Sequence, residues 1–171
     1  DRESSIWVNR VATPLGSMIL GVQDDGLCLL EFAERRMLDT QLGRLSRHIG
    51  RVYLPGEHPL IEQTKQELDA SFAGTLRHFD IPVQAPGTAF QEAVWHALRE
   101  IPYGETRSYA EIADATVRAD AVRAGGRANG DNRIAIVIPC HRVVGSDGEL
   151  VGYGGGLWRK EYLLAMEQAQ A

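Results

Sequence analysis

The first half of the chain alternates apolar runs with turn signals. Runs rich in strand-forming residues predict strands over residues 7–11, 18–22 and 27–32. Asp24-Asp25-Gly26 predicts a hairpin between the last two. Scattered apolar positions over residues 34–48, and a period near 3.6 residues after Pro59, predict two helices. This order of elements indicates an α/β unit.

The clearest change in composition lies at residues 81–87. This stretch contains Pro82, Pro86 and Gly87, which favour an extended linker over a helix or strand. We therefore expect one domain over residues 1–86, with a structural role, and a second, mostly helical domain over residues 87–171.

Helical signals dominate beyond the linker. Thr88 and Ser108 are each followed three residues later by Gln or Glu, and this capping-box pattern predicts that helices begin there. The second of these covers residues 108–116, and after a short turn another helix is expected over residues 120–128. This spacing is typical both of an ordinary αα-hairpin and of a DNA-binding helix-turn-helix.

The second helix of that pair has an unusual composition. Gly125 and Gly126 each cost about 1 kcal/mol relative to alanine inside a helix. Arg123 and Arg127 are four residues apart, so they share one face. Two interpretations stay open: a solvated helix that packs tightly at its glycines, or a helix whose backbone approaches something large.

The apolar run over residues 134–138 predicts a strand that Pro139 ends. Cys140, His141 and Arg142 follow directly. A thiol attacks as the thiolate, and a nearby base or positive charge increases the thiolate fraction. Cysteine is also among the most frequently buried residue types. A cysteine at a strand end beside histidine and arginine nevertheless favours chemistry over simple packing.

A glycine-rich stretch at residues 152–156 surrounds Tyr153. It lacks the Gly-Lys-Ser/Thr of a phosphate loop, and its glycines do not follow GxGxxG. A flexible loop that lines a flat pocket, with Tyr153 as a wall, fits better. A final helix is predicted over residues 158–168, with Trp158, Tyr162, Leu163 and Met166 in the core.

Composition and charge narrow the possible classes of protein. A chain of 171 residues can bury a core without disulfides. Cys28 lies in an apolar run, and no CxxC or close Cys/His set is visible, so we expect neither a disulfide nor a bound metal. A net charge of -5 argues against general nucleic-acid affinity. A local basic stripe nevertheless consists of Arg118, Arg123, Arg127, Arg133 and Arg142, with Asp120 and Asp131 among them.

The ends of the chain and its apolar runs bear on location. No run approaches the roughly 20 apolar residues of a membrane span, and residues 1–5 lack the basic-then-apolar order of a secretory signal. We expect a cytoplasmic protein without membrane contact. Because the chain begins with Asp1, we also expect a processed product or one part of a longer protein.

The motifs of the second half occur together in one order. They include Ile138-Pro139-Cys140-His141-Arg142-Val143, and the others cover residues 90–95, 101–106, 108–109, 123–126, 128–130, 132 and 152–157. This set resembles the O6-alkylguanine-DNA alkyltransferases, also called methylated-DNA-protein-cysteine methyltransferases, over residues 88–167. The Thr13-Pro14-Leu15-Gly16-Ser17 turn before a hairpin adds a weaker similarity to the amino-terminal half of the same family.

The resemblance implies an α/β (α+β) fold in two parts. The amino-terminal strand-hairpin and helix domain would be ribonuclease H-like. The carboxy-terminal domain would be winged-helix-like, contain the helix-turn-helix, and carry DNA binding and alkyl transfer. The implied activity is a single-turnover repair in which the alkyl group of O6-alkylguanine, and of O4-alkylthymine, moves irreversibly to Cys140 without a cofactor.

The resemblance also implies roles for individual residues. Cys140 would attack the alkyl carbon, His141 would take the thiol proton through a water, and Glu167 would orient the imidazole. Asn132 would hydrogen-bond the turn that presents Cys140. In the pocket, the carbonyls of Cys140 and Val143 would accept from the guanine amino group, the Gly154 N–H would donate to the guanine oxygen, and Tyr153 would form a wall.

Double-stranded DNA is the implied partner of an expected monomer, bound through the minor groove. The target nucleotide must leave the stack to be reached. Arg123 would fill its place and Tyr109 would help to rotate the phosphate, while Gly126 and Ala128 would lie against DNA.

Two positions depart from the pattern of many relatives, and one arginine has two interpretations. Arg133 stands in place of proline, as a phosphate contact or a surface charge, and Gly154 stands in place of a serine found in some members. Arg142 is interpreted either as an inward anchor to carbonyls or as a phosphate contact. Two alternative functions stay open: a lesion-sensing DNA-binding protein of the alkyltransferase-like type, and a cysteine hydrolase.

Overall fold

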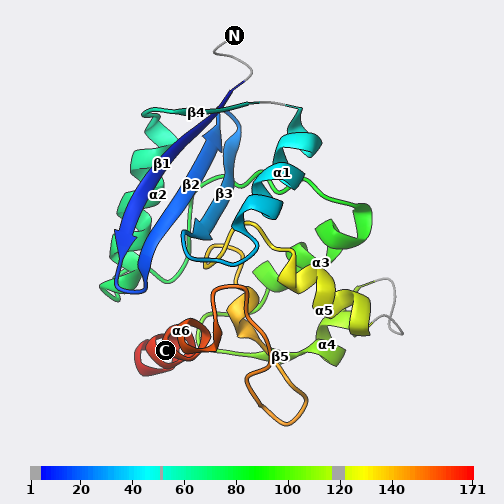
Figure 1. Ribbon diagram of the computed structural model, residues 1–171. Helices are drawn as coiled ribbons and strands as arrows, with labels where there is room; N and C mark the ends of the chain where they lie inside the picture. Colours follow the sequence, from blue (N-terminus) through cyan, green and yellow to red (C-terminus); the bar gives the residue numbers. More distant parts are fainter. Residues whose placement is uncertain (1–4, 51, 117–121) are drawn as a thin grey trace. The chain divides into compact units, whose positions relative to one another are not determined.

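The computed structural model describes residues 5–50, 52–116 and 122–171. The chain divides into two compact units, residues 1–86 and 87–171 (Figure 1). The division falls within the proline- and glycine-containing stretch at residues 81–87.

The first unit contains a four-stranded mixed sheet in the order β3-β2-β1-β4. Its strands are β1 (Ser5–Thr13), β2 (Gly16–Gln23), β3 (Gly26–Phe32) and β4 (Val52–Pro55). The three predicted strands and the β2–β3 hairpin are confirmed. β4 pairs parallel to β1, and the sequence did not predict it, because its four residues are mostly exposed and show no apolar alternation.

Two helices, α1 (Leu38–Ile49) and α2 (Pro59–Phe72), cover opposite faces of this sheet (Figure 1). Leu45 of α1 packs in one cluster with Ile6 and Cys28, so Cys28 is the buried strand residue that the sequence predicts. Lys65 of α2 donates to the Asn9 side chain at 3.2 Å. Successive residues of a strand point to opposite faces, and this alternation separates the two helices.

The second unit is mostly helical. Its helices are α3 (Ala89–Arg99), α4 (Tyr109–Asp114), α5 (Val122–Gly130) and α6 (Leu157–Gln170). Both predicted capping boxes form, at Thr88 and at Ser108. A short parallel pair joins β5 (Arg107–Ser108) to β6 (Val143–Val144). The helix-turn-helix corresponds to α4 and α5, although the predicted start of α5 at Asp120 lies outside the described residues.

Residues 134–138 do not form the predicted strand. They form tight turns, in which the Ile138 N–H donates to the Ile134 carbonyl at 3.0 Å and Ile136 has a φ of 71°. The apolar pattern reported burial correctly, since all five residues are buried. A mostly β-branched apolar run can be buried in turns as well as in a strand, provided that its backbone N–H and C=O groups find hydrogen-bond partners.

The expected core positions of the last helix are also wrong in part. Trp158 is 56% exposed and Tyr162 is 43% exposed. They lie four residues apart on the outer face of α6, while its buried face carries Arg159, Lys160 and Glu167 beside leucines. Because three charged residues are buried on that face, the positions of the apolar residues did not show which face of α6 lies in the core.

No helix among the described residues is both long and apolar enough to cross a membrane. In the same part of the chain, no three His, Cys, Asp or Glu side chains are grouped so that they could hold a metal ion.

Candidate active site

Cys140 begins a single 3-10 turn, Cys140–Arg142, between the turns of residues 134–138 and β6. Its N–H donates to the Ile138 carbonyl at 2.8 Å, and the Arg142 N–H donates to the Pro139 carbonyl at 3.0 Å. The cysteine is 7% exposed. The backbone therefore holds the thiol in a fixed place just below the surface.

Asn132 closes the turns that precede Cys140. Its Oδ1 accepts from the Ile134 N–H at 2.9 Å, and its Nδ2 donates to the Ile138 carbonyl at 2.9 Å. Asn132 thus hydrogen-bonds the turns that lead to Cys140, as the family resemblance implied. These hydrogen bonds also help to hold Ile136 in the left-handed region, which costs a residue other than glycine about 1–3 kcal/mol.

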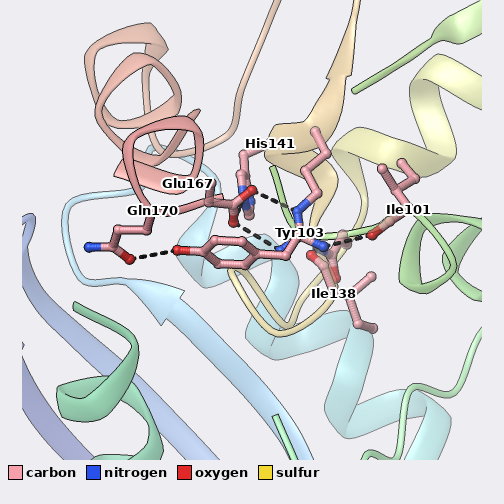
Figure 2. A network of polar contacts seen from close by, with 8 residues as sticks. Ile101, Tyr103, Ile138, His141, Glu167 and Gln170 are labelled. Carbon is pink, nitrogen blue, oxygen red and sulfur yellow. Dashed lines mark hydrogen bonds and ion pairs between the residues drawn. The ribbon is translucent and has the colours of Figure 1, made fainter. Parts of the chain in front are cut away.

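His141 is fully buried, and its Nε2 is hydrogen-bonded to Glu167 Oε2 at 2.7 Å (Figure 2). Its Nδ1 has no partner in the described part of the chain. Because Glu167 is an acceptor when ionised, the hydrogen-bond network assigns the ring proton to Nε2. Nδ1 then carries the lone pair, so the ring is oriented as a base at Nδ1.

Arg142 takes the inward position that the sequence offered as one of two interpretations. Its Nη1 donates to the Ile101 carbonyl at 2.8 Å, while Nε and Nη2 donate to the two oxygens of Glu167 at 2.8 and 2.9 Å. The guanidinium also lies 5.5 Å from the Tyr103 ring centroid, and the Tyr103 hydroxyl donates to Gln170 at 2.8 Å. A phosphate contact is excluded for this buried side chain.

The site favours an ionised Glu167 and a neutral His141. Burial alone would raise the pKa of Glu167, but hydrogen bonds from His141 and Arg142, together with their charges, lower it to about 2. Burial lowers the pKa of His141 below its usual 6.5, against the opposing effect of Glu167. At neutral pH the imidazole is therefore available to accept a proton.

Tyr109 and Lys160 hold the start of the glycine-rich loop. The Tyr109 hydroxyl donates to the Val151 carbonyl at 2.6 Å, and Lys160 Nζ donates to the Gly152 carbonyl at 3.1 Å. Burial raises the pKa of Tyr109, and the negative charge of Cys140 as a thiolate adds to this effect. Burial lowers the pKa of Lys160, whereas the Cys140 charge opposes that shift. Both side chains therefore lie within electrostatic reach of the thiol.

The predicted pocket residues lie close to Cys140 in the chain or on the glycine-rich loop. Val143 is fully buried, and its N–H donates to the Cys140 carbonyl. A carbonyl has two lone pairs, so that of Cys140 can still accept a second donor. Tyr153 is half-buried and Gly154 is exposed.

The predicted DNA-facing residues divide into two groups. Arg123 and Arg127 are exposed on α5, whereas Gly125 is buried, although a Cβ added to it would meet no atom within 4 Å among the described residues beyond its own stretch of helix backbone. A Cβ at Gly126 would make ordinary contact with the Tyr109 ring at 3.7 Å. Ala128 differs from the expectation: it is buried, and its carbonyl accepts from Trp95 Nε1 at 2.9 Å, so it packs α5 on α3.

Comparison with known proteins identifies the family. The family model of the 6-O-methylguanine DNA methyltransferase DNA-binding domain matches residues 89–169. A methylated-DNA–protein-cysteine methyltransferase of Mycobacterium leprae is 44% identical over 158 residues, which are 92% of this chain and 90% of that protein. The chain belongs to the methylated-DNA–protein-cysteine methyltransferase family.

Solved structures of this methyltransferase family share the fold of the whole chain. The O6-methylguanine methyltransferase of Mycobacterium tuberculosis superposes with a TM-score of 0.82 at 40% identity, over 97% of this chain and 94% of that one. The structure of Mycobacterium tuberculosis OGT in complex with DNA gives a TM-score of 0.81 at 40% identity, over 98% and 94% of the two chains. The predicted two-part α/β fold is confirmed.

One correction concerns Arg133, a position at which this methyltransferase-family chain was expected to depart from many relatives. Arg133 was expected to be a phosphate contact or a surface charge, but it is 4% exposed, and its guanidinium lies 5.4 Å from the Trp95 ring centroid. An aromatic face attracts a cation and lets a guanidinium stack in a buried place. Arg133 therefore contributes to packing within the second unit.

The sequence reasoning missed Lys160 and the pairing of Arg142 with Glu167. Lys160 is fully buried on the inner face of α6 with Leu163 and Leu164. A lysine at three- and four-residue spacing from buried leucines was a signal that could have marked it. The Arg142–Glu167 pair joins residues 25 apart in sequence, and no local pattern indicates it.

Proposed function

We propose that this chain repairs alkylated DNA directly, by moving the alkyl group from O6 of guanine to the sulfur of Cys140. The observation that carries the proposal is the Cys140-His141 pair. Nε2 of the imidazole is hydrogen-bonded to Glu167, so Nδ1 is left as the basic nitrogen. The names of the relatives, methylated-DNA–protein-cysteine methyltransferases, support the same reaction.

The proposed reaction is a displacement at the alkyl carbon. His141 takes the Cys140 proton through a water, and the thiolate forms the S–C bond as the C–O6 bond breaks. The electron pair stays on guanine, where the Gly154 N–H stabilises the developing charge on the oxygen. The guanine anion takes up one proton from water at a ring nitrogen, and His141 releases the proton that it took from the thiol, so that charge and protons balance. Lys160 adds a positive charge that favours the thiolate.

The transfer is stoichiometric. A thioether is not hydrolysed in water at neutral pH, and the other cysteine of the chain, Cys28, is buried in the first unit. One protein therefore repairs one lesion. We extend the proposal to O4-alkylthymine, whose alkyl group is attached to a comparable oxygen.

DNA binding is proposed for the second unit, which the DNA-binding family model matches. Helix α5 would lie in the minor groove of a duplex bound by one monomer. The exposed Arg123 would fill the place of the flipped nucleotide, while Tyr109 would rotate its phosphate. Gly126 is half-buried, and a wide side chain there would hold the α5 backbone away from DNA, whereas Gly125 is buried within the second unit.

The two alternatives have less support. A lesion sensor without repair needs no nucleophile, whereas this chain keeps Cys140 next to an oriented base and its similar relatives have methyltransferase names. A cysteine hydrolase would need the imidazole to return a proton to a leaving group and a second site to stabilise an oxyanion. Nothing in the described site favours that cycle over a single transfer.

Mass spectrometry tests the proposed function. After incubation with duplex DNA that contains O6-methylguanine, we expect one methyl group per protein, on Cys140. Cys28, which is buried in the first unit, is the internal control and stays unmodified. The Cys140→Ala variant would take up no methyl group. A folded protein that binds the lesion but leaves Cys140 unmodified would support the lesion sensor instead.

A further inference from the structure

The glycine-rich loop is fastened at both ends. Its start is held by Tyr109 and Lys160, which donate to the carbonyls of Val151 and Gly152 at 2.6 and 3.1 Å. Its end is held by Arg159, whose Nη1 donates to the Gly155 carbonyl at 2.9 Å. Residues 153 and 154, which contribute to the proposed pocket, lie between these anchors.

Arg159 makes its contact from beneath an exposed tryptophan. Arg159 is only 5% exposed, and its guanidinium lies 4.4 Å from the Trp158 ring centroid. Stacking on an aromatic face suits a planar guanidinium and removes water from one side of it. The indole of Trp158 therefore covers the anchor, which accounts for a large apolar residue at the surface.

The same indole also packs closely against the loop at Gly156. This glycine has a φ of +93°, and a Cβ built on it would come within 3.3 Å of the Trp158 ring. Trp158 and Arg159 thus hold the end of the loop in two ways, by covering Gly156 and by hydrogen bonding to Gly155.

Resting on the proposed function, we propose that Arg159 is a positioning residue that sets the preferred size of the alkyl group. Glycine has the largest backbone freedom of any residue, so a loop with glycines at 152, 154, 155 and 156 needs external anchors to keep one shape. Releasing Gly155 would let Tyr153 and the Gly154 N–H shift relative to Cys140. A methyl group depends on close alignment, whereas a benzyl group profits from a wider pocket.

The test compares two alkyl groups in the same duplex, O6-methylguanine and O6-benzylguanine. Arg159→Met keeps the aliphatic stem but loses the donor and the stacking cation. We expect transfer of the methyl group to slow about tenfold, as for the loss of a buried charged hydrogen bond, and transfer of the benzyl group to slow by about twofold at most. Trp158→Phe keeps an aromatic cover and should leave the wild-type ratio of the two rates unchanged, whereas Trp158→Ala should shift that ratio in the same direction as Arg159→Met.

A control and a second readout keep the result interpretable. Arg99→Met makes the same charge change at an exposed position of α3 and should leave the ratio of rates unchanged. Hydrogen exchange of the amides of residues 152–156 should become faster in Arg159→Met than in Arg99→Met, and this does not depend on activity.

Two results would overturn the inference: an equal loss with both alkyl groups, or unchanged exchange of the loop in Arg159→Met. A wild-type protein that accepts neither alkyl group overturns the proposed function and the size preference with it. Faster exchange would still support the anchoring by Arg159 in that case.

Discussion

Glu167 determines the protonation of the site because its two oxygens are both occupied. His141 and the fork of Arg142 bond the carboxylate, while Arg142 also bonds the Ile101 carbonyl. The carboxylate is kept ionised, and the ionised carboxylate fixes which nitrogen of His141 carries the proton. The resemblance predicted that Glu167 orients His141, but the arginine that fixes Glu167 became visible only in the structure.

We predict that Arg142→Lys destabilises the protein even though it keeps the charge. Lysine cannot reproduce the three directed donors of the guanidinium, so part of the Glu167 carboxylate or the Ile101 carbonyl loses its partner. The free energy of unfolding should fall by about 2 kcal/mol. Urea denaturation measures this, with the exposed Arg99→Lys as the control. Equal midpoints for both variants would contradict the anchoring role.

Helices α5 and α6 show how one element presents two different faces. On α5, Arg123 and Arg127 are exposed while Ala128 packs against Trp95. On α6, the buried face carries charges that the site uses, and the outer face carries Trp158. The sequence located both helices correctly and placed Leu163 in the core, but it assigned Trp158 and Tyr162 to the wrong face of α6, because the buried face of α6 also carries charged side chains.

For α5, we predict that Arg123→Ala impairs nucleotide flipping but leaves the alkyl-transfer step itself nearly unchanged. Arg123 is exposed and would act on the duplex, so its removal should slow repair of duplex O6-methylguanine by about tenfold or more, while the rate with the free base O6-benzylguanine stays within about twofold. Single-turnover rates on both substrates give the comparison. Equal losses on the two substrates would exclude the role of Arg123 in flipping.

On the scale of the whole molecule, the basic stripe is smaller than the sequence indicated. Arg133 and Arg142 are buried, and Arg118 lies outside the described residues. Among the described members of the stripe, Arg123 and Arg127 remain exposed, both on α5. In a protein with a net charge of -5, this concentrates the attraction for phosphates on the helix proposed to enter the groove.

The stability of the whole molecule should fall in acid. The pKa of Glu167 is lowered from 4.5 to about 2, so its ionised form contributes roughly 3 kcal/mol above pH 4.5, and this contribution is lost as the pH falls toward 2. His141 also lowers the stability as the pH falls below 6.5. Its pKa is lower in the folded protein, so the unfolded chain binds the proton more readily. Denaturation followed between pH 7 and pH 3 measures the slope.

Glu167→Gln should lower stability at neutral pH and make the dependence on pH below 4.5 shallower, since the titrating carboxylate is gone. Glu161→Gln, an exposed position on the same helix, serves as the control and should keep the wild-type slope. A wild-type slope in Glu167→Gln would place the acid sensitivity elsewhere in the molecule.

Local signals in the sequence determined a large part of this protein. The β2–β3 hairpin, the capping boxes at Thr88 and Ser108, and the helix that begins at Pro59 each depend on neighbouring residues, so they could be predicted. The ordered motifs of residues 88–167 were enough to indicate the family, which the comparisons confirm.

Tertiary structure decided what depends on residues that are far apart in sequence. Arg142 turned inward because Glu167 and Ile101, 25 and 41 residues away in sequence, accept its hydrogen bonds. The run over residues 134–138 became turns because the side chain of Asn132, although close in sequence, bonds its backbone, and an apolar pattern does not report such a bond. Arg133 was buried because Trp95 offers an aromatic face. Sequence patterns report how apolar a position is, but the partner that makes a buried charge or a strained backbone stable is chosen by the fold.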